Sequence, residues 1–288
     1  MKVLPVSKLV LGTAQLGMKY GVTNFSGLPS HAASLEILET AWKNGIHFFD
    51  TAPDYNSELI IGDFVRKNNL SDKVKICTKI PSIPPEQDWQ IFIENTISSS
   101  LSILGCETIE VLFFHNPSDS KLVLKNPLFF QELMDKFQIL NLGVSVYNPK
   151  EIEILQASEI ELSFQFPYNI VDTRFENIQI KGGNRFARSI FLQGLLISSK
   201  SIIKSNPKLS SFQKKYHNLL SELKLDGLRV AISKVSYSNK IDYFLVGVEK
   251  LEQLIELVNL NLYDMSKLNL LDDVSESDIE IIDPRLWN

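Results

Sequence analysis

Short, almost continuously apolar runs recur along the whole chain, separated by segments in which apolar positions repeat every three or four residues. Eight such runs are rich in β-branched or aromatic residues: KLVLGTA, IHFFDT, VKICTKI, IEVLFFH, ILNLGVSV, IELSFQF, RFARSIF and YFLVGV. Continuous apolarity over a short run is typical of strands that are buried on both faces, as in a parallel sheet. The pattern therefore predicts eight buried parallel strands.

The segments between these runs have the marks of helices. After Ser30, a residue type favoured at helix N-termini, apolar residues recur at helical spacing until Gly45, which would end the helix before the next strand. Residues 91–104 and 250–260 repeat this pattern. Alternating strands and helices predict one α/β domain over residues 1–288, and eight units are the number that closes into a (β/α)8 TIM barrel.

Two segments exceed a minimal barrel. Between the seventh and eighth predicted strands, the chain is long enough for two helices, around 208–223 and 226–238. Residues 265–288 include the acidic stretch DDVSESDIEIIDPRLWN, which fits no ninth unit. This tail is either packed at the chain end or an extra wall over the barrel mouth, with Leu286 or Trp287 near a substrate.

Composition narrows the class of protein. The chain has 288 residues, a net charge of −5 and 44% hydrophobic residues, and its Lys and Arg residues are scattered, so we expect neither nucleic acid nor a membrane surface as a partner. Cys77 and Cys106 lack CxxC or metal-ligand spacing and are interpreted as reduced, buried residues. No signal peptide or membrane helix is evident, so a cytoplasmic protein without a metal site is expected.

Four residues suggest chemistry, because they stand where predicted strands end. Asp50, Lys79 and His115 lie at or just past the ends of three successive runs, and Tyr55 follows Asp50 in the loop. A parallel barrel gathers such positions at one mouth, where barrels place their active sites. Taken singly, each residue is more often a packing residue or a solvated charge, but together they favour a catalytic site.

The four side chains together suit the reduction of a carbonyl group. A phenol has an unperturbed pKa of roughly 10, and a neighbouring ammonium group should lower the pKa of Tyr55 and make it a usable proton donor. Asp50 would keep Lys79 charged and oriented. His115 could donate a hydrogen bond to the same carbonyl oxygen.

Over nearly its whole length, the chain resembles the aldo-keto reductases, and in particular those of bacterial type. The resemblance is carried by LVLGTAQLG, GIHFFDTAPDY, ICTKI, LFFHNP, LGVSVYNP, FQFPYNIVDTRF, FARSIFLQGLL and FLVGVEKLEQL, which occur in the family's order. It implies a (β/α)8 barrel that binds a nicotinamide cofactor without a Rossmann domain. It also implies Tyr55 as general acid, Lys79 and Asp50 as its support, and His115 as a residue that shapes the substrate pocket.

The same resemblance implies the cofactor contacts. Asp50 belongs to them, Ser145 and Gln165 would bond the carboxamide, and Arg188 occupies the position whose side chain stacks on the nicotinamide ring. Two positions depart from the family pattern, since Val146 replaces an Asn and Arg188 replaces a Tyr or Trp. The diphosphate and its ribose would lie near seven further residues: Gly12, Thr13, Ser189, Phe191, Gln193 and the backbone of Gly247 and Val248.

The residues implied at the adenosine end of the cofactor do not decide between NADPH and NADH. Lys250, Gln253 and Glu256 fall where family members bind this part of the cofactor, and Gln253 stands where NADP-specific members have an Arg. Losing this Arg removes the best partner of a 2′-phosphate. NADPH is the family's usual cofactor, and NADH is an alternative.

The leading hypothesis is an NAD(P)H-dependent reductase of an aldehyde or ketone, acting on a small-molecule carbonyl substrate. Two alternatives are a non-catalytic, nucleotide-binding regulatory subunit on the same fold and a lyase or isomerase barrel for phosphorylated sugars. The polar residues Asn169, Asp172 and Arg174 suggest a sugar-derived carbonyl compound as one substrate class. The same residues could instead brace their own loop. No motif indicates the substrate or the oligomeric state.

Overall fold

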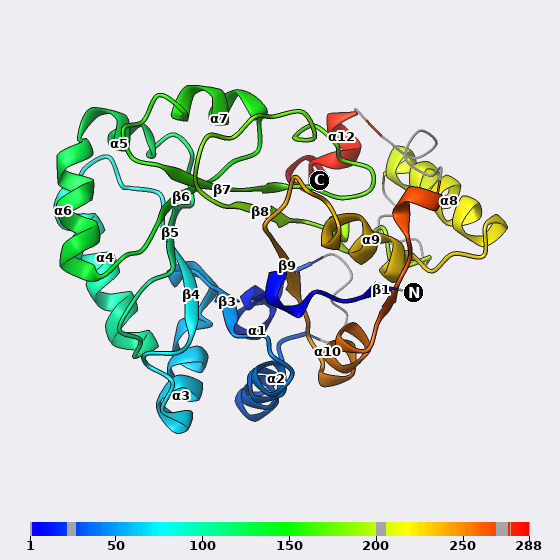
Figure 1. The fold of residues 1–288 in the computed structure, drawn as a ribbon, viewed down its shortest axis with the longest axis horizontal. Coiled ribbons are helices and arrows are strands. Elements are labelled where there is room, and N and C mark those ends of the chain that lie inside the picture. The colour runs from blue at the N-terminus through cyan, green and yellow to red at the C-terminus, as the bar shows by residue number, and fades with distance from the viewer. Residues whose placement is uncertain (1, 22–26, 200–205, 269–275, 277, 288) are drawn as a thin grey trace.

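The centre of the protein is a closed barrel of eight parallel strands (Figure 1). A computed structural model describes residues 2–21, 27–199, 206–268, 276 and 278–287. The barrel strands are β2 (Leu9–Gly12), β3 (Phe48–Asp50), β4 (Lys75–Ile80), β5 (Val111–Phe114), β6 (Leu142–Ser145), β7 (Leu162–Pro167), β8 (Arg185–Arg188) and β9 (Tyr243–Gly247). Each strand pairs with the next, and β9 closes on β2, which confirms the predicted barrel.

Helices surround the barrel, as their periodicity predicts. They are α1 (Ala14–Gly17), α2 (His31–Lys43), α3 (Glu58–Asn68), α4 (Trp89–Leu104), α5 (Lys121–Lys125), α6 (Pro127–Phe137), α7 (Pro149–Leu155), α8 (Pro207–Glu222), α9 (Gly227–Ser236), α10 (Leu251–Val258) and α12 (Ile279–Ile282). Ser30 caps α2 by accepting from Ala33 N at 3.2 Å, and Gly105 ends α4 with a φ of 65°. Helices α8 and α9 are the two predicted between the last barrel strands.

Short elements complete the chain. Strand β1 (Lys2–Val3) pairs antiparallel with β10 (Asn261–Leu262). Single 3-10 turns cover η1 (Val6–Lys8), η2 (Pro53–Tyr55), η3 (Leu192–Gly194), η4 (Met265–Lys267) and η5 (Pro284–Leu286). Turns η2 and η3 follow the C-terminal ends of β3 and β8, so both lie at the barrel mouth.

The barrel interior is filled by an apolar layer that supports a polar layer above it. The rings of Phe48 and Phe113 meet the ring of Phe186 edge-on, with centroids 5.9 and 5.3 Å apart. Gly143 is required beside them, because a Cβ there would lie 2.5 Å from the Phe113 ring. Side chains alternate along a strand, so the next inward positions rise one layer toward the mouth. These positions are Asp50, Lys79, His115, Ser145, Gln165 and Arg188.

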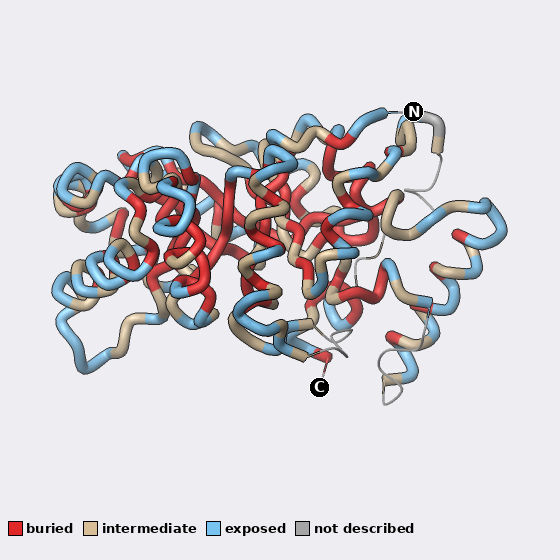
Figure 2. Tube along the Cα trace, turned by 90° about the horizontal axis from the view of Figure 1, so that it is seen from below, coloured by how far each residue is buried: buried red, intermediate tan, exposed pale blue. Residues whose placement is uncertain are grey.

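The main core joins residues of the barrel strands to residues of the surrounding helices, and buried segments run through the middle of the molecule (Figure 2). A smaller, separate cluster involves α8, α9 and the tail. In that cluster Trp287 is buried with Val230 and Leu195, and its indole Nε1 donates to Ile281 O at 3.1 Å. The described part of the tail is therefore packed. Residues 269–275 and 277, which hold much of the acidic stretch, lie outside the described residues.

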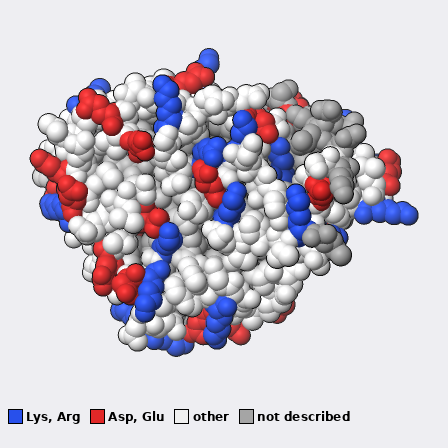
Figure 3. Space-filling view, viewed as in Figure 1, with Lys and Arg blue, Asp and Glu red and all other residues white. Residues whose placement is uncertain are grey.

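The surface in Figure 3 carries Lys and Arg side chains interspersed with Asp and Glu. Both buried cysteines, Cys77 and Cys106, are free thiols, as expected from their spacing. Among the helices that the structure describes, none combines the length and apolarity needed to cross a membrane.

Candidate active site

A buried ion pair forms the floor of the site. Lys79, on β4, is 1% exposed, and its Nζ donates at 2.7 Å both to Asp50 Oδ1 and to Thr51 O. Gln165 Nε2, on β7, donates to the other carboxylate oxygen of Asp50 at 2.9 Å. Burial is the largest single influence and lowers the pKa of Lys79, but the charge and hydrogen bond of Asp50 and the neighbouring Tyr55 and Cys77 together outweigh it, so the pKa is raised. Lys79 therefore carries its positive charge at neutral pH.

Tyr55 stands over this pair at the end of η2. Lys79 Nζ lies 4.8 Å from the centre of its ring. Burial raises the pKa of Tyr55, and the charge of Lys79 lowers it by less, so the pKa is raised on balance. The expectation of a lowered pKa was thus wrong, because burial outweighs the ammonium group. The phenol stays protonated, which is the form that a proton donor needs.

Gly17, at the end of α1, lets this turn come close. A Cβ at Gly17 would lie 2.0 Å from Tyr55 O and 2.5 Å from Ser57 N. Asn56 follows Tyr55 in the left-handed region, with a φ of 58°. The position of Tyr55 therefore depends on the absence of a side chain in the LGTAQLG segment.

His115 completes the group. Its ring lies edge-on to that of Tyr55, with centroids 5.9 Å apart, and its Nδ1 is 3.9 Å from Asp54 Oδ2. Burial is the main cause of a lowered pKa for His115, so its imidazole is mostly neutral near pH 7. The four residues singled out by their places at strand ends thus lie together at the mouth.

A cavity of about 400 Å³ extends from this group toward the first turn of α10. This volume is within the usual range for ligand pockets. The cavity is lined by Asp50 and Tyr55 and by ten of the other residues expected at the cofactor: Gly12, Gln165, Arg188, Ser189, Phe191, Gln193, Gly247, Val248, Gln253 and Glu256.

Three expected cofactor residues do not line this cavity. Thr13 is fully buried behind the site, where its hydroxyl donates to Asp50 O at 2.8 Å. Ser145 is buried beside Gln165, its register partner on β7. Lys250 is the residue that precedes α10. Lys79 and His115 likewise lie beyond the lining, below and beside Tyr55.

The cavity also has lining residues that sequence reasoning missed. Gln15 packs against Gly247, where a Cβ would lie 2.2 Å from the Gln15 amide. Tyr20 approaches from the other side, with its hydroxyl 3.4 Å from Gln193 Nε2. Glu249 lines the end of the cavity next to α10, and burial raises its pKa. Gln15 could have been found from its motif, since LGTAQLG follows the first strand, but Tyr20 has no comparable signal.

The wall after β8 is sharply bent. Ser189, Leu192 and Gln193 have positive φ values of 55°, 45° and 56°. Such conformations are costly for residues other than glycine and concentrate at ligand sites. This bend brings residues 189–194 onto the cavity.

The first turn of α10 uses Gln253 for its own cap. Gln253 Oε1 accepts from Glu249 N at 2.8 Å and from Lys250 N at 3.3 Å. The amide thereby satisfies backbone donors that have no partner within the helix. Glu249 and Glu256 add carboxylates to the same end of the cavity.

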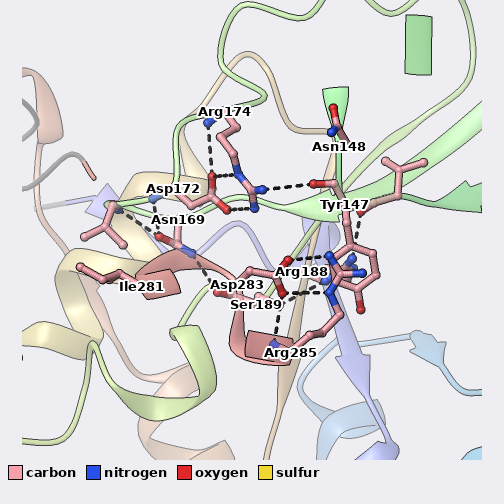
Figure 4. A network of polar contacts seen from close by, with 12 residues as sticks. Tyr147, Asn148, Asn169, Asp172, Arg174, Arg188, Ser189, Ile281, Asp283 and Arg285 are labelled. Carbon is pink, nitrogen blue, oxygen red and sulfur yellow. Dashed lines mark hydrogen bonds and ion pairs between the residues drawn. The ribbon is translucent and has the colours of Figure 1, made fainter. Parts of the chain in front are cut away.

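Arg188 is held by Tyr147 (Figure 4) and by the backbone of Val146. Its guanidinium carbon lies 3.9 Å from the centre of the Tyr147 ring, and its Nη2 donates to Val146 O at 2.9 Å. Arg285, from the tail, lies 3.4 Å from the same ring centre and pairs with the buried Asp283. Two guanidinium groups at these distances cannot lie on the same face of one ring, so the Tyr147 ring lies between Arg188 and Arg285.

The tail thus reaches the mouth through Arg285, rather than through the residues expected. Trp287 packs into the smaller core cluster, and Leu286 is half exposed; neither lines the cavity.

The polar residues after β7 brace this wall. Asp172 is fully buried and pairs with Arg174 through two hydrogen bonds of 2.9 and 2.7 Å. Asn169 Nδ2 donates to Ser189 O at 3.1 Å, and its Oδ1 accepts from the backbone of residues 171 and 172. All three side chains are used within the protein, which agrees with the bracing role rather than with contact to a sugar.

A barrel with this buried pair, a tyrosine over it and a cavity running to the last barrel helix defines the aldo-keto reductase type of site. The profile of the Aldo/keto reductase family matches residues 8–276, and the chain belongs to this family. Over 187 residues it is 26% identical to Aldo-keto reductase YhdN of Bacillus subtilis (strain 168). The match covers 60% of this chain and 53% of that protein, so the chain spans about half the length of this relative.

Proposed function

We propose that the protein is an NAD(P)H-dependent reductase that converts an aldehyde or ketone to an alcohol. The observation that carries the proposal is the Lys79–Asp50 pair beneath Tyr55, with His115 beside the same phenol. Family membership supports the proposal.

The lining of the cavity fits a dinucleotide. Gly12 and Gly247 face one another across neighbouring strands and keep the cavity floor free of side chains. Gln165 uses its amide nitrogen on Asp50, so its oxygen remains to accept from a carboxamide. Residues 189–194 and the turn before α10 would hold the diphosphate and adenosine. When bound, the nicotinamide supplies the hydride.

The residues of the chain supply the rest. Tyr55 donates its phenolic proton to the carbonyl oxygen as that oxygen gains negative charge. The charged Lys79 beneath the ring stabilises the phenolate that remains, and Asp50 holds Lys79 in place. Neutral His115 donates a hydrogen bond to the same oxygen and orients the carbonyl.

The adenosine end favours acceptance of NADH beside the family's usual NADPH. Glu249 and Glu256 line this end, and a carboxylate near a 2′-phosphate is unfavourable. Gln253 is an uncharged residue at the position of the family Arg. We propose that both cofactors bind.

The test combines binding with turnover. Quenching of tryptophan fluorescence by NADPH and by NADH, titrated separately, gives the two dissociation constants, and loss of cofactor absorbance with a panel of neutral aldehydes gives turnover. Turnover that is abolished in Tyr55→Phe supports the reductase. Tight cofactor binding with no turnover of any carbonyl would favour the regulatory subunit.

A further inference from the structure

Arg188 belongs to the reacting end of the cavity. It is the last residue of β8 and lines the cavity with Asp50, Tyr55 and Gln165. Burial is the largest influence on the pKa values of Tyr55 and His115, and the positive charge of Arg188 acts on both groups. Its guanidinium therefore lies close to where a carbonyl group would be reduced.

The charge of Arg188 has no carboxylate partner in the described part of the chain, unlike the charges of Lys79 and Arg285. Lys79 pairs with Asp50, and Arg285 pairs with Asp283. Arg188 Nη2 donates to a backbone carbonyl, its Nη1 lies 3.4 Å from the Ser189 hydroxyl, and its Nε is buried without an acceptor. A guanidinium has five N–H donors and these two contacts use only two of them, so the half-exposed side chain keeps N–H donors for a ligand in the cavity.

The protein also fixes the plane of this guanidinium. Tyr147 stacks on it, and the other face of Tyr147 is covered by Arg285. Tyr147 is itself held by its backbone, whose carbonyl accepts from Arg174 Nη1 at 3.3 Å and whose N–H donates to Glu151 Oε2 at 2.8 Å. A guanidinium held in this way is a fork that suits a carboxylate.

We propose that Arg188 binds a carboxylate of the substrate, so that the protein reduces an aldehyde or ketone that also carries a carboxylate group. This proposal rests on the proposed reductase function, because it assigns a substrate class to the same site. One guanidinium provides one positive charge, and the exposed Asp54 lies beside His115 on the other side of Tyr55. A singly charged carboxylate fits this balance better than a phosphate dianion does.

The test uses para-carboxybenzaldehyde and its methyl ester, which differ in charge but share the reacting aldehyde. We expect kcat/KM for the acid to exceed that for the ester, and Arg188→Met to reduce this acid-to-ester ratio roughly ten- to a hundredfold. Arg188→Lys keeps the charge without the fork and should give an intermediate ratio. Arg285→Met removes the other cation on Tyr147 and leaves the Arg188 guanidinium in place, so it should lower the ratio far less than Arg188→Met does.

Equal losses on both substrates in Arg188→Met, or no preference for the acid in the wild type, would overturn the assignment while the reductase function stands. If neither aldehyde is reduced although NAD(P)H binds, the proposed function fails instead. Calorimetric titration of the cofactor complex with benzoate then tests anion binding by Arg188 independently of turnover. Benzoate binding that is lost in Arg188→Met and weakened in Arg188→Lys supports the anion site, and no binding to the wild type rejects it. Should Arg188→Met not fold, the Lys variant carries both measurements.

Discussion

Arg188 Nη2 donates to the backbone carbonyl of Val146 at 2.9 Å, and this bond joins the two positions at which the chain departs from its family pattern. The Val146 side chain is fully buried, so this residue presents only its backbone to the guanidinium. The two departures thus form one structural unit on neighbouring parts of the mouth. Val146→Asn alone would bury an amide group beside the Arg188 guanidinium, which already donates to the backbone of this residue.

Tyr55→Phe should remove most carbonyl reduction. General acid catalysis is worth about 10²–10⁴-fold, and the substitution deletes the proton donor while keeping the ring over Lys79. The measurement is turnover of a neutral aldehyde, with the dissociation constant of NADPH as the control. Wild-type turnover in this variant would show that another group donates the proton.

Lys79→Met should lower both stability and turnover. It leaves the buried Asp50 carboxylate without its cation, and breaking a buried pair costs about 3–5 kcal/mol. Because the pKa of Lys79 is raised, its contribution is fully present at neutral pH and is lost only as pH rises through the folded-state value. Denaturant unfolding at neutral pH measures the loss of stability.

The same variant should shift the pH dependence of reduction. Lys79 lowers the pKa of Tyr55, so its removal should raise this pKa further and move the alkaline limb of kcat to higher pH. The rate itself should fall, because a weaker acid transfers its proton less readily. An alkaline limb that stays in place would contradict the role of Lys79 beside Tyr55.

The barrel and the four catalytic candidates could be predicted because both follow from strand geometry. Strands buried on both faces need continuous apolar runs, and alternation along β3 and β4 places Asp50 and Lys79 on the inward face at the mouth. The net shift in the pKa of Tyr55 could not be predicted, because it depends on how deeply the phenol is buried. Nor could the contact of Tyr147 with Arg285, because nothing in the sequence relates the tail to this strand end.

Side-chain direction was the other limit. Asn169 and Asp172 have types suited to a substrate, yet they face the protein and satisfy loop donors. Gln253 has the position of a cofactor contact, and its oxygen turns back to cap α10. Sequence spacing places such residues near a site but does not decide between a ligand and the backbone as their partner.

Gly17→Ala should impair catalysis more than cofactor binding. A methyl group at this position would overlap Tyr55 O, so the turn that carries the phenol must move. Misplacement by about 1 Å can cost on the order of a hundredfold in rate. We expect kcat to fall while the NADPH dissociation constant and the circular dichroism spectrum stay close to those of the wild type. Unchanged turnover would show that Tyr55 tolerates the displacement.

Gln253→Arg should strengthen NADPH binding relative to NADH. A guanidinium at this position of the cavity can pair with the 2′-phosphate, and hydrogen bonds to charged groups are worth roughly 1.5–3 kcal/mol before solvent screening. The substitution also removes the acceptor for Glu249 N and Lys250 N, and the loss of a cap costs about 1 kcal/mol of stability. The measurement is the ratio of the two dissociation constants at low and moderate salt.

Two matched variants separate charge from capping at this position. Gln253→Glu keeps an oxygen acceptor for the cap and adds a negative charge, so it should move the ratio toward NADH without the loss of stability. Gln253→Met loses the cap without adding charge, and it should lower the melting temperature while leaving the ratio near that of the wild type. Opposite shifts in the Arg and Glu variants, both weaker at the higher salt concentration, would show that residue 253 faces the 2′ position of the bound cofactor. Equal ratios in all four proteins would mean that the adenosine ribose lies away from the first turn of α10.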